Sequence, residues 1–437
     1  MICSLHSVFT RTGDAVIPPG IRKAAFLLSG SAAIGHLCGL LAIPLVARLY
    51  TPADFGVFAV CLSILTTLLI VSSLRFNNAI PIQESDRETR SLVVFCLIAC
   101  LIMTVVTGIV ALTLIPILLP GLGDGLTNLY ATIIAAGFLL SGISMVLAHW
   151  NIRERNYEQN AKSTLASGIV GPVVKICAGV ASMTAGLFVG DFFSRAGELL
   201  VQCSGFRGRL RQELSGLSPE EVWRAARRNM HFALFSAPAS LLSTFAQQVP
   251  VIVIVYAYGP SDAGLYAMAY ALVSIPLSVV IPTVAQLFLG EVAPLIRTKP
   301  QEIRRFYLGA LKKMAVFTIP LMAVLAVAAP FLFPLYLGHS WEGAGLLCLP
   351  LAVVIAVQMI FAISILNLTG FNRWALGLEI FRMVAVLGAL ISGPVLGLDL
   401  GEVLFLYSVV ITISCLGGYM LNLKAIDYIE YELPALR

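Results

Sequence analysis

Six charged residues stand inside long apolar stretches of this chain, where an unpaired charge is costly and usually functional. They are Lys175, Asp191, Arg195, Glu198, Glu379 and Arg382. Basic side chains in a shielded cavity bind phosphates and other anions, whereas a shielded carboxylate takes up a proton or a metal cation. The three cations are therefore candidate ligands for an anionic substrate. The three carboxylates are candidate sites of coupling to H⁺ or Na⁺.

Helical spacing gathers five of these charges into two groups. Asp191, Arg195 and Glu198 are separated by four and three residues, so they share one face of a helix. Glu379 and Arg382 are three residues apart and share a face in the same way. An alternative interpretation is structural, in which each arginine neutralises a neighbouring carboxylate and fixes helix packing.

Lys175 and Arg75 stand apart from these groups. Lys175 has no carboxylate at helical spacing within its own apolar run, so its charge requires either a partner from another helix or an anionic ligand. Arg75 closes an apolar run and is expected at the membrane interface. There it would meet an anionic head group or serve as a plain topology anchor. His36 is a candidate proton site, although a helix–helix hydrogen bond explains it equally simply.

The composition of the chain indicates that the apolar stretches around these charges span a membrane. Hydrophobic residues make up 59% of the 437 residues and charged residues only 12%, against roughly 45–50% and about 25% in soluble domains. The apolar residues form runs of about 20, the length that spans a bilayer. The sequence predicts an all-α polytopic membrane protein of about twelve helices. The expected spans are 25–46, 56–76, 91–118, 127–148, 163–180, 183–203, 232–257, 263–287, 314–337, 345–367, 375–396 and 402–422.

The basic residues predict the orientation. With the N-terminus in the cytoplasm, all but four of the 28 lysines and arginines fall in cytoplasmic segments. The exceptions are Arg48, Lys175, Arg195 and Arg382. Both termini are therefore expected in the cytoplasm, with the first membrane helix as the insertion signal. The net charge of +5 reflects this topology, so nucleic-acid binding is not expected. The nine cysteines lack metal-ligand spacing, and we expect neither a metal nor another cofactor.

A short internal repeat predicts two lobes. Residues 51–59 read TPADFGVFA, and residues 259–267, which lie 208 positions later, read GPSDAGLYA. An even number of spans separates the copies, so the halves should be parallel repeats that enclose a central cavity. The same offset carries Lys175 to position 383, beside Arg382. We expect a cytoplasmic segment (1–24), an N-lobe (25–203), a linker (204–231), a C-lobe (232–422) and a cytoplasmic tail (423–437).

The linker carries one further signal. Ser218, Pro219 and Glu221 have the spacing of a capping box with proline at the first helical position. A short amphipathic helix with Trp223 and three arginines should follow along the membrane surface. A solvated basic linker that anchors the topology is the simpler alternative.

Two blocks of the sequence resemble a known family. The first reads RLYTPADFGVF at 48–58 and LRFNNAIPI at 74–82, and the second reads AMAY at 267–270, SIPL at 274–277 and IPTVAQLF at 281–288. Both blocks are similar to the polysaccharide biosynthesis transporters, the Wzx-type flippases of O-antigen. The family often has an acidic residue where Asn77 stands, so no charge role is transferred to that position.

The resemblance implies the fold of the multidrug/oligosaccharidyl-lipid/polysaccharide exporters and alternating access. It also implies the substrate, an oligosaccharide on undecaprenyl diphosphate, which is moved from the cytoplasmic to the periplasmic leaflet of the bacterial inner membrane. Lys175, Arg195 and Arg382, with Arg75 at the cytoplasmic opening, would bind the diphosphate and acidic sugars. Besides membrane lipids, the implied partners are a polysaccharide polymerase and glycosyltransferases.

Two rival functions remain at this point. A polymerase or ligase of O-antigen would act on the same lipid as an enzyme, but it requires a large basic periplasmic loop, and every predicted outer loop is short. A multidrug exporter of the same superfamily would share the fold and favour an acidic cavity. The three cations and three carboxylates within the spans do not decide between an exporter of drugs and a flippase.

Overall fold

The computed structural model describes residues 19–206, 216–277, 300–366 and 372–432, with a few scattered residues from 280 to 295. The predicted linker is therefore described only at 204–206 and 216–231. The chain divides into two compact units, one of Ile17–Gly264 and one that contains Leu265–Arg437. The lobe boundaries expected at 203 and 232 remain a prediction.

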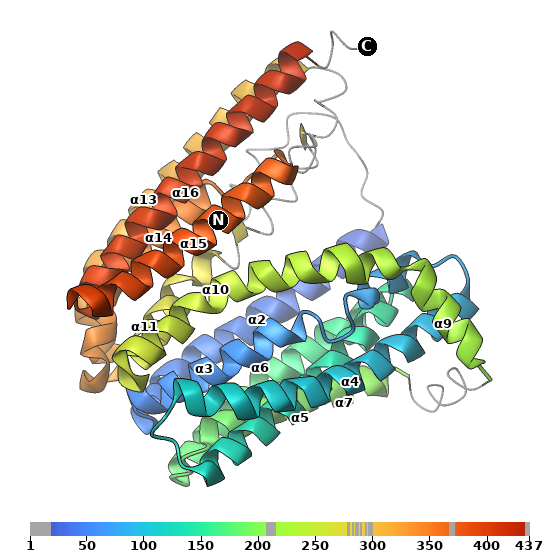
Figure 1. Cartoon of the computed structure of the whole chain (residues 1–437), viewed down its shortest axis with the longest axis horizontal. Coiled ribbons are helices and arrows are strands. Elements are labelled where there is room, and N and C mark those ends of the chain that lie inside the picture. Colours follow the sequence, from blue (N-terminus) through green and yellow to red (C-terminus); the bar gives the residue numbers. More distant parts are fainter. Residues whose placement is uncertain are drawn as a thin grey trace. The chain divides into compact units, whose positions relative to one another are not determined.

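The first unit is a bundle of long helices (Figure 1). In chain order it contains α2 (Pro19–Leu49), α3 (Pro52–Leu69), the 3₁₀ helix η1 (Phe76–Ile82), α4 (Asp86–Leu118), α5 (Asp124–Arg153), α6 (Tyr157–Val180), α7 (Gly186–Ser204), α9 (Pro219–Arg228), the π-helical turn η2 (Phe232–Ser236), α10 (Ala237–Tyr258) and the first residues of α11 (Pro260–Val273). α6 packs against both α2 and α7, and α5 packs against α3, α4 and α7.

The second unit is also helical in the residues that the structure describes. Its elements are η3 (Pro300–Glu302), α13 (Ile303–Leu337), η4 (His339–Trp341), α14 (Glu342–Ile360), α15 (Asn372–Leu396), α16 (Leu400–Asp427) and η6 (Tyr428–Glu432). α14 ends at Ile360, earlier than the predicted 367. Asn422 of α16 accepts a hydrogen bond from the Ile365 amide at 2.8 Å. This bond satisfies backbone that has left the helix, as a segment at membrane depth requires.

Each predicted span overlaps one of these helices. Nine helices in the described residues are long and apolar enough to cross a membrane. α7 falls outside that set in spite of its 19 residues, since it carries the charged group at 191, 195 and 198. α2 has a shorter apolar segment, Leu37–Leu49. The prediction of an all-helical chain that crosses the membrane many times is confirmed.

α3 ends sooner than its hydropathy predicts. The span expected to run from 56 to 76 is helical only to Leu69, and turns lead to Leu74 and Arg75, which have φ of 50° and 65°. The chain then enters η1, whose Phe76 and Ile80 are 1% and 0% exposed in a core with α4, α5 and α9. Hydropathy alone does not predict the end of the helix, because the residues of the turn are as apolar as those of the helix. Burial of η1 provides the reason for the break.

The linker helix forms as the sequence predicts. Ser218 Oγ accepts a hydrogen bond from the Glu221 amide and Glu221 Oε2 accepts one from the Ser218 amide, each at 3.2 Å, so the capping box at the start of α9 is complete. The bond from the Ser218 amide, aided by Arg87, holds the pKa of Glu221 below its ordinary value. Ion pairs of 2.8 Å join Arg87 to Glu221 and Arg228 to Glu88. α9 is therefore fastened to the start of α4.

The two copies of the sequence repeat touch each other inside the first unit. Thr51 caps α3 in a capping box with Asp54, and positive φ at Gly259 turns the chain into α11. A Cβ added to Gly56 would overlap the Pro260 carbonyl, and a Cβ added to Gly264 would overlap the Pro52 carbonyl. The contact is reciprocal, as in an interface related by a twofold axis. Both glycines are required because backbone occupies the space of a side chain.

We expect Gly56→Ala and Gly264→Ala each to lower stability by about 1–3 kcal/mol, because the helix starts must separate to admit a methyl group. Gly39→Ala is the matched control, since nothing lies within 4 Å of a Cβ at that helical position. Thermal unfolding in detergent, followed by tryptophan fluorescence, measures the difference. Equal melting temperatures for the three variants would contradict the reciprocal contact.

Candidate functional site

Lys175 lies between three helices of the first unit. Its Nζ is 4.9 Å from the centroid of the Phe58 ring on α3, a cation–π contact. Its backbone carbonyl accepts a hydrogen bond of 2.8 Å from the Tyr50 hydroxyl. Asp191 and Arg195 of α7 both act on it electrostatically. No carboxylate in the described residues forms an ion pair with Lys175, so its charge is stabilised by a ring and by a more distant carboxylate.

Small residues bring α6 and α7 close enough to shape this site. A Cβ at Gly190 would collide with Cγ of Lys175 and would meet the Gly171 carbonyl. Across the same helix contact, Ser194 Oγ donates a hydrogen bond of 2.9 Å to the Ser167 carbonyl. Small residues allow such an approach in membrane helices. Gly190 thus provides the space for the aliphatic stem of Lys175.

Arg195 is held by partners on two helices. Its Nε donates to Asp191 Oδ2 at 2.7 Å, and its Nη1 donates to Ser141 Oγ of α5 at 2.6 Å. The side chains of Arg195 and Asp191 are 14% and 23% exposed. Through these bonds Arg195 links α7 to α5. This geometry supports the structural interpretation, in which Arg195 neutralises Asp191 and fixes helix packing. Substrate binding by Arg195 remains a prediction.

The polar face of α7 continues past its charged residues. Asp191, Arg195, Glu198 and Gln202 follow the spacing of one helix face. Gln202 is 1% exposed; its Oε1 accepts from Asn151 Nδ2 at 2.6 Å and its Nε2 donates to Ser163 Oγ at 2.8 Å. Reasoning from charges alone missed these amides. Gln202 lies four residues after Glu198, on the same helix face, and this spacing is the sequence feature that predicts it.

Glu198 differs from the other carboxylates of the spans. Arg195 acts on it electrostatically, and Ser144 of α5 lies beside it. Arg195 itself is directed at Asp191 and Ser141. Within the described part of the chain, Glu198 forms no ion pair. A half-buried carboxylate without a bound cation is the group best suited to exchange a proton.

Arg382 and Glu379 of α15 form an ion pair three residues apart in the second unit. Their side chains are 30% and 45% exposed, more than those of Arg195 and Asp191. The spacing predicted this pair, and it satisfies both charges locally. Binding of substrate by Arg382 and of an ion by Glu379 remain predictions.

Arg75 lies in the strained turn after α3, about half-buried. No ion pair is formed by Arg75 within the described residues, and its Nε is buried without a hydrogen-bond acceptor. The four predicted cations thus fall into two classes in the structure. Arg195 and Arg382 are paired with carboxylates, whereas Lys175 and Arg75 are not.

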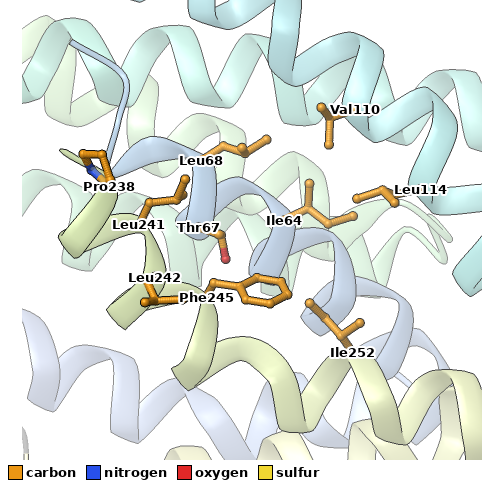
Figure 2. Close-up of a pocket in the computed structure, with 10 residues that line it drawn as sticks. All are labelled: Ile64, Thr67, Leu68, Val110, Leu114, Pro238, Leu241, Leu242, Phe245 and Ile252. Atoms are coloured by element: carbon orange, nitrogen blue, oxygen red, sulfur yellow. The ribbon is translucent and has the colours of Figure 1, made fainter. Parts of the chain in front are cut away.

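An apolar cavity of about 470 Å³ opens between α3, α4 and α10 in the first unit. Figure 2 shows aliphatic side chains and Phe245 around it, and Thr67 is the one polar residue among the ten that line it. Engineered apolar cavities of about 150 Å³ stay dry and accept hydrocarbons such as benzene. The lining of this larger cavity suits a hydrocarbon chain and not a sugar or a phosphate.

Comparison with known proteins places these features in context. The sequence profile of polysaccharide biosynthesis proteins matches residues 45–345. The chain is also similar to the succinoglycan biosynthesis transport protein ExoT of Rhizobium meliloti (strain 1021). The two are 23% identical over 380 residues, which cover 81% of this chain and 70% of the relative.

Solved structures share the fold. An inward-facing multidrug transporter of the MATE family, in the MOP superfamily, has a TM-score of 0.64 at 16% identity and covers 97% of this chain and 98% of its own. An outward-facing multidrug transporter of the MATE family has a TM-score of 0.59 at 16% identity, and the match covers 93% of this chain and 96% of that one. A third match is a MOP superfamily transporter from Pyrococcus furiosus, which is described as having a binding pocket of reverse polarity. Its TM-score is 0.54 at 15% identity, and the match covers 93% of this chain and 96% of that one. The predicted MATE-like fold is confirmed.

We expect Asp191→Asn to lower stability by about 1–3 kcal/mol, because it leaves the Arg195 charge without its partner in a mostly shielded place. The double variant Asp191→Asn/Arg195→Gln should regain most of this loss. Glu379→Gln is the matched control on the more exposed pair, with an expected loss below about 1 kcal/mol. Thermal unfolding in detergent tests all three. Equal losses from Asp191→Asn and Glu379→Gln would contradict the difference in burial.

Proposed function

This chain belongs to the polysaccharide biosynthesis protein family, and from that premise we propose that it flips an oligosaccharide linked to undecaprenyl diphosphate. It is a multi-pass membrane transporter with the MOP fold, and not an enzyme. The proposed step moves an O-antigen or exopolysaccharide repeat unit from the cytoplasmic to the periplasmic leaflet of the inner membrane by alternating access. Both termini would lie in the cytoplasm. The glycosyltransferases that build the lipid and the polymerase that consumes the product are the proposed partners.

The observation that carries this proposal is the state of Lys175. Its ammonium group lies within a membrane helix, touches an aromatic ring and forms no ion pair in the described residues. A ring contact stabilises a shielded cation by about 2 kcal/mol and leaves its charge in place. A diphosphate would neutralise that charge. Lys175 is therefore the proposed primary ligand, with Arg75, Arg195 and Arg382 as further proposed contacts.

The apolar cavity supports a substrate that carries a lipid. A hydrocarbon tail requires an apolar route along the protein while the polar head group moves. The cavity between α3, α4 and α10 is large and almost free of polar atoms, and it lies in the same unit as Lys175. A hydrophilic polysaccharide without a lipid would have no use for it.

Coupling to an ion is the second part of the proposal. Asp191 and Glu379 each bind an arginine, whereas Glu198 forms no ion pair in the described residues. Glu198 is therefore the first of the three carboxylates to test for proton or sodium exchange. Loss of its charge would also change the field at Arg195, which acts on it directly. This link joins ion uptake to the helix that faces Lys175.

A multidrug exporter is the alternative function within the same fold. The structural resemblance to multidrug transporters is at 16% identity and supports the fold alone. Export of cationic drugs calls for unpaired carboxylates in the cavity. Among the candidate charges in the described residues, Glu198 is one carboxylate without an ion pair, whereas Lys175 and Arg75 are two cations without one, and this balance favours an anionic substrate. Family membership and these two cations together favour the lipid-linked oligosaccharide.

Lys175→Ala should abolish or strongly reduce surface polysaccharide in a complementation assay at matched protein levels, because the diphosphate loses its proposed ligand. Lys175→Arg should retain part of the activity, since it preserves the charge. Lys162→Ala is the matched control, a lysine of the same helix whose side chain is 59% exposed and paired with Glu158. Full export by Lys175→Ala would refute the proposed role of Lys175.

A further inference from the structure

The short helix α9 has a buried face and an exposed tryptophan. Ala225 and Ala226 are 7% and 0% exposed and belong to the core that η1, α4 and α5 form. Trp223 is 57% exposed. Tryptophan is enriched where a protein meets the membrane–water interface, because its ring is apolar and its N–H is polar.

Two ion pairs fix the rotation of α9 about its own axis. Glu221 pairs with Arg87 and Arg228 pairs with Glu88, each at 2.8 Å. Both partners belong to the first turn of α4. The flank of α9 that carries Glu221 and Arg228 therefore faces that turn.

The start of α4 indicates which flank of α9 faces the bilayer. Four of the five residues at 86–90 are charged, and the helix then continues without a charged residue to Leu118. The charged turn thus lies outside the hydrocarbon core. α9 packs against α4 and runs across its direction, as a helix in the plane of the interface does (Figure 1). With one flank bound to the charged turn, the opposite flank of α9 is directed toward the bilayer.

Trp223 and Arg227 lie on this opposite flank. At about 100° per residue, Trp223 is roughly 200° around the helix from Glu221, and Arg227 follows Trp223 by one turn. Arg227 is exposed and forms no ion pair in the part of the chain that the structure describes. Glu220, an acidic residue of the exposed face, lies two turns away from Arg227. The charge next to Trp223 is therefore positive and complements a negatively charged membrane surface.

We propose that α9 binds an anionic phospholipid of the surrounding membrane, with Trp223 at the level of the head groups and Arg227 on the lipid phosphate. Arginine donates paired hydrogen bonds to phosphate. One basic residue at the surface of a negatively charged leaflet favours binding roughly fivefold. This site is separate from Lys175, and it does not depend on which substrate the protein transports.

Quenching of tryptophan fluorescence in nanodiscs tests the site on the full-length protein. The discs contain equal parts of phosphatidylglycerol and phosphatidylcholine, and one of the two lipids carries bromine, a short-range quencher, near its head group. The difference in emission between the wild type and Trp223→Phe isolates Trp223 from the rest of the four tryptophans. We expect Trp223 to be quenched, and more strongly when phosphatidylglycerol carries the bromine.

Arg227→Gln should remove most of the preference for phosphatidylglycerol, a change of up to roughly fivefold, whereas Arg227→Lys should keep much of it. Arg305→Gln is the matched control, because it removes the same charge from an exposed position of α13 and should leave the preference unchanged. Thermal unfolding of Arg227→Gln in detergent should match that of the wild type, since this variant breaks no ion pair of α9 in the described residues.

Four results would overturn the lipid site. No quenching of Trp223 by either lipid would mean that α9 is a solvated linker or serves a soluble partner. Equal quenching by both lipids in the wild type would show that the charge of the lipid is not recognised. Unchanged preference in Arg227→Gln, or an equal loss in Arg227→Gln and Arg305→Gln, would remove Arg227 from the site.

Discussion

The absence of water inside a membrane governs this structure, because every charge placed there must find a partner or a ligand. In the first unit the constraint explains the contact of α5 with α7. Arg195 joins Asp191 on its own helix to Ser141 on the neighbouring one, and Gln202 extends the polar face toward Asn151 and Ser163. The remaining faces of the helices are free to meet lipid.

The same constraint divides the cations of the spans into those with an ion pair and those without one in the described residues. Arg195 forms an ion pair with Asp191, and Arg382 forms one with Glu379, so each pair neutralises its own charges. Lys175, with only a ring contact, and Arg75, with a buried Nε that lacks an acceptor, have no such partner in the described residues. For an anionic substrate, the unpaired cations are the first proposed contacts, since Arg195 and Arg382 must share their charge with a carboxylate before they can bind a diphosphate. The apolar cavity beside α3 complements the cations, as a lipid carrier has both a charged head and a hydrocarbon tail.

Much of the fold follows from the sequence, because apolar runs, capping boxes and short repeats are local signals. The Ser218–Glu221 box appears where the pattern places it, whereas the contact of Gly56 with the start of α11 was seen only in the structure. The charge pair at 191 and 195 was also predictable from helical spacing. The break after Leu69 was not, since burial of Phe76 and Ile80 against distant helices decides it. Ser141 and Asn151 were missed for the same reason: their partners lie on other helices, and single uncharged polar residues carry no spacing signal.

Translocation by the purified protein in proteoliposomes tests the central claim most directly. A fluorescent oligosaccharide on undecaprenyl diphosphate is compared with the same oligosaccharide on undecaprenol, which lacks the diphosphate, and an added quencher reports the leaflet. The account predicts protein-dependent movement of the diphosphate lipid and little movement of the uncharged one. Equal movement of both lipids, or none of the diphosphate lipid in active vesicles, would contradict it.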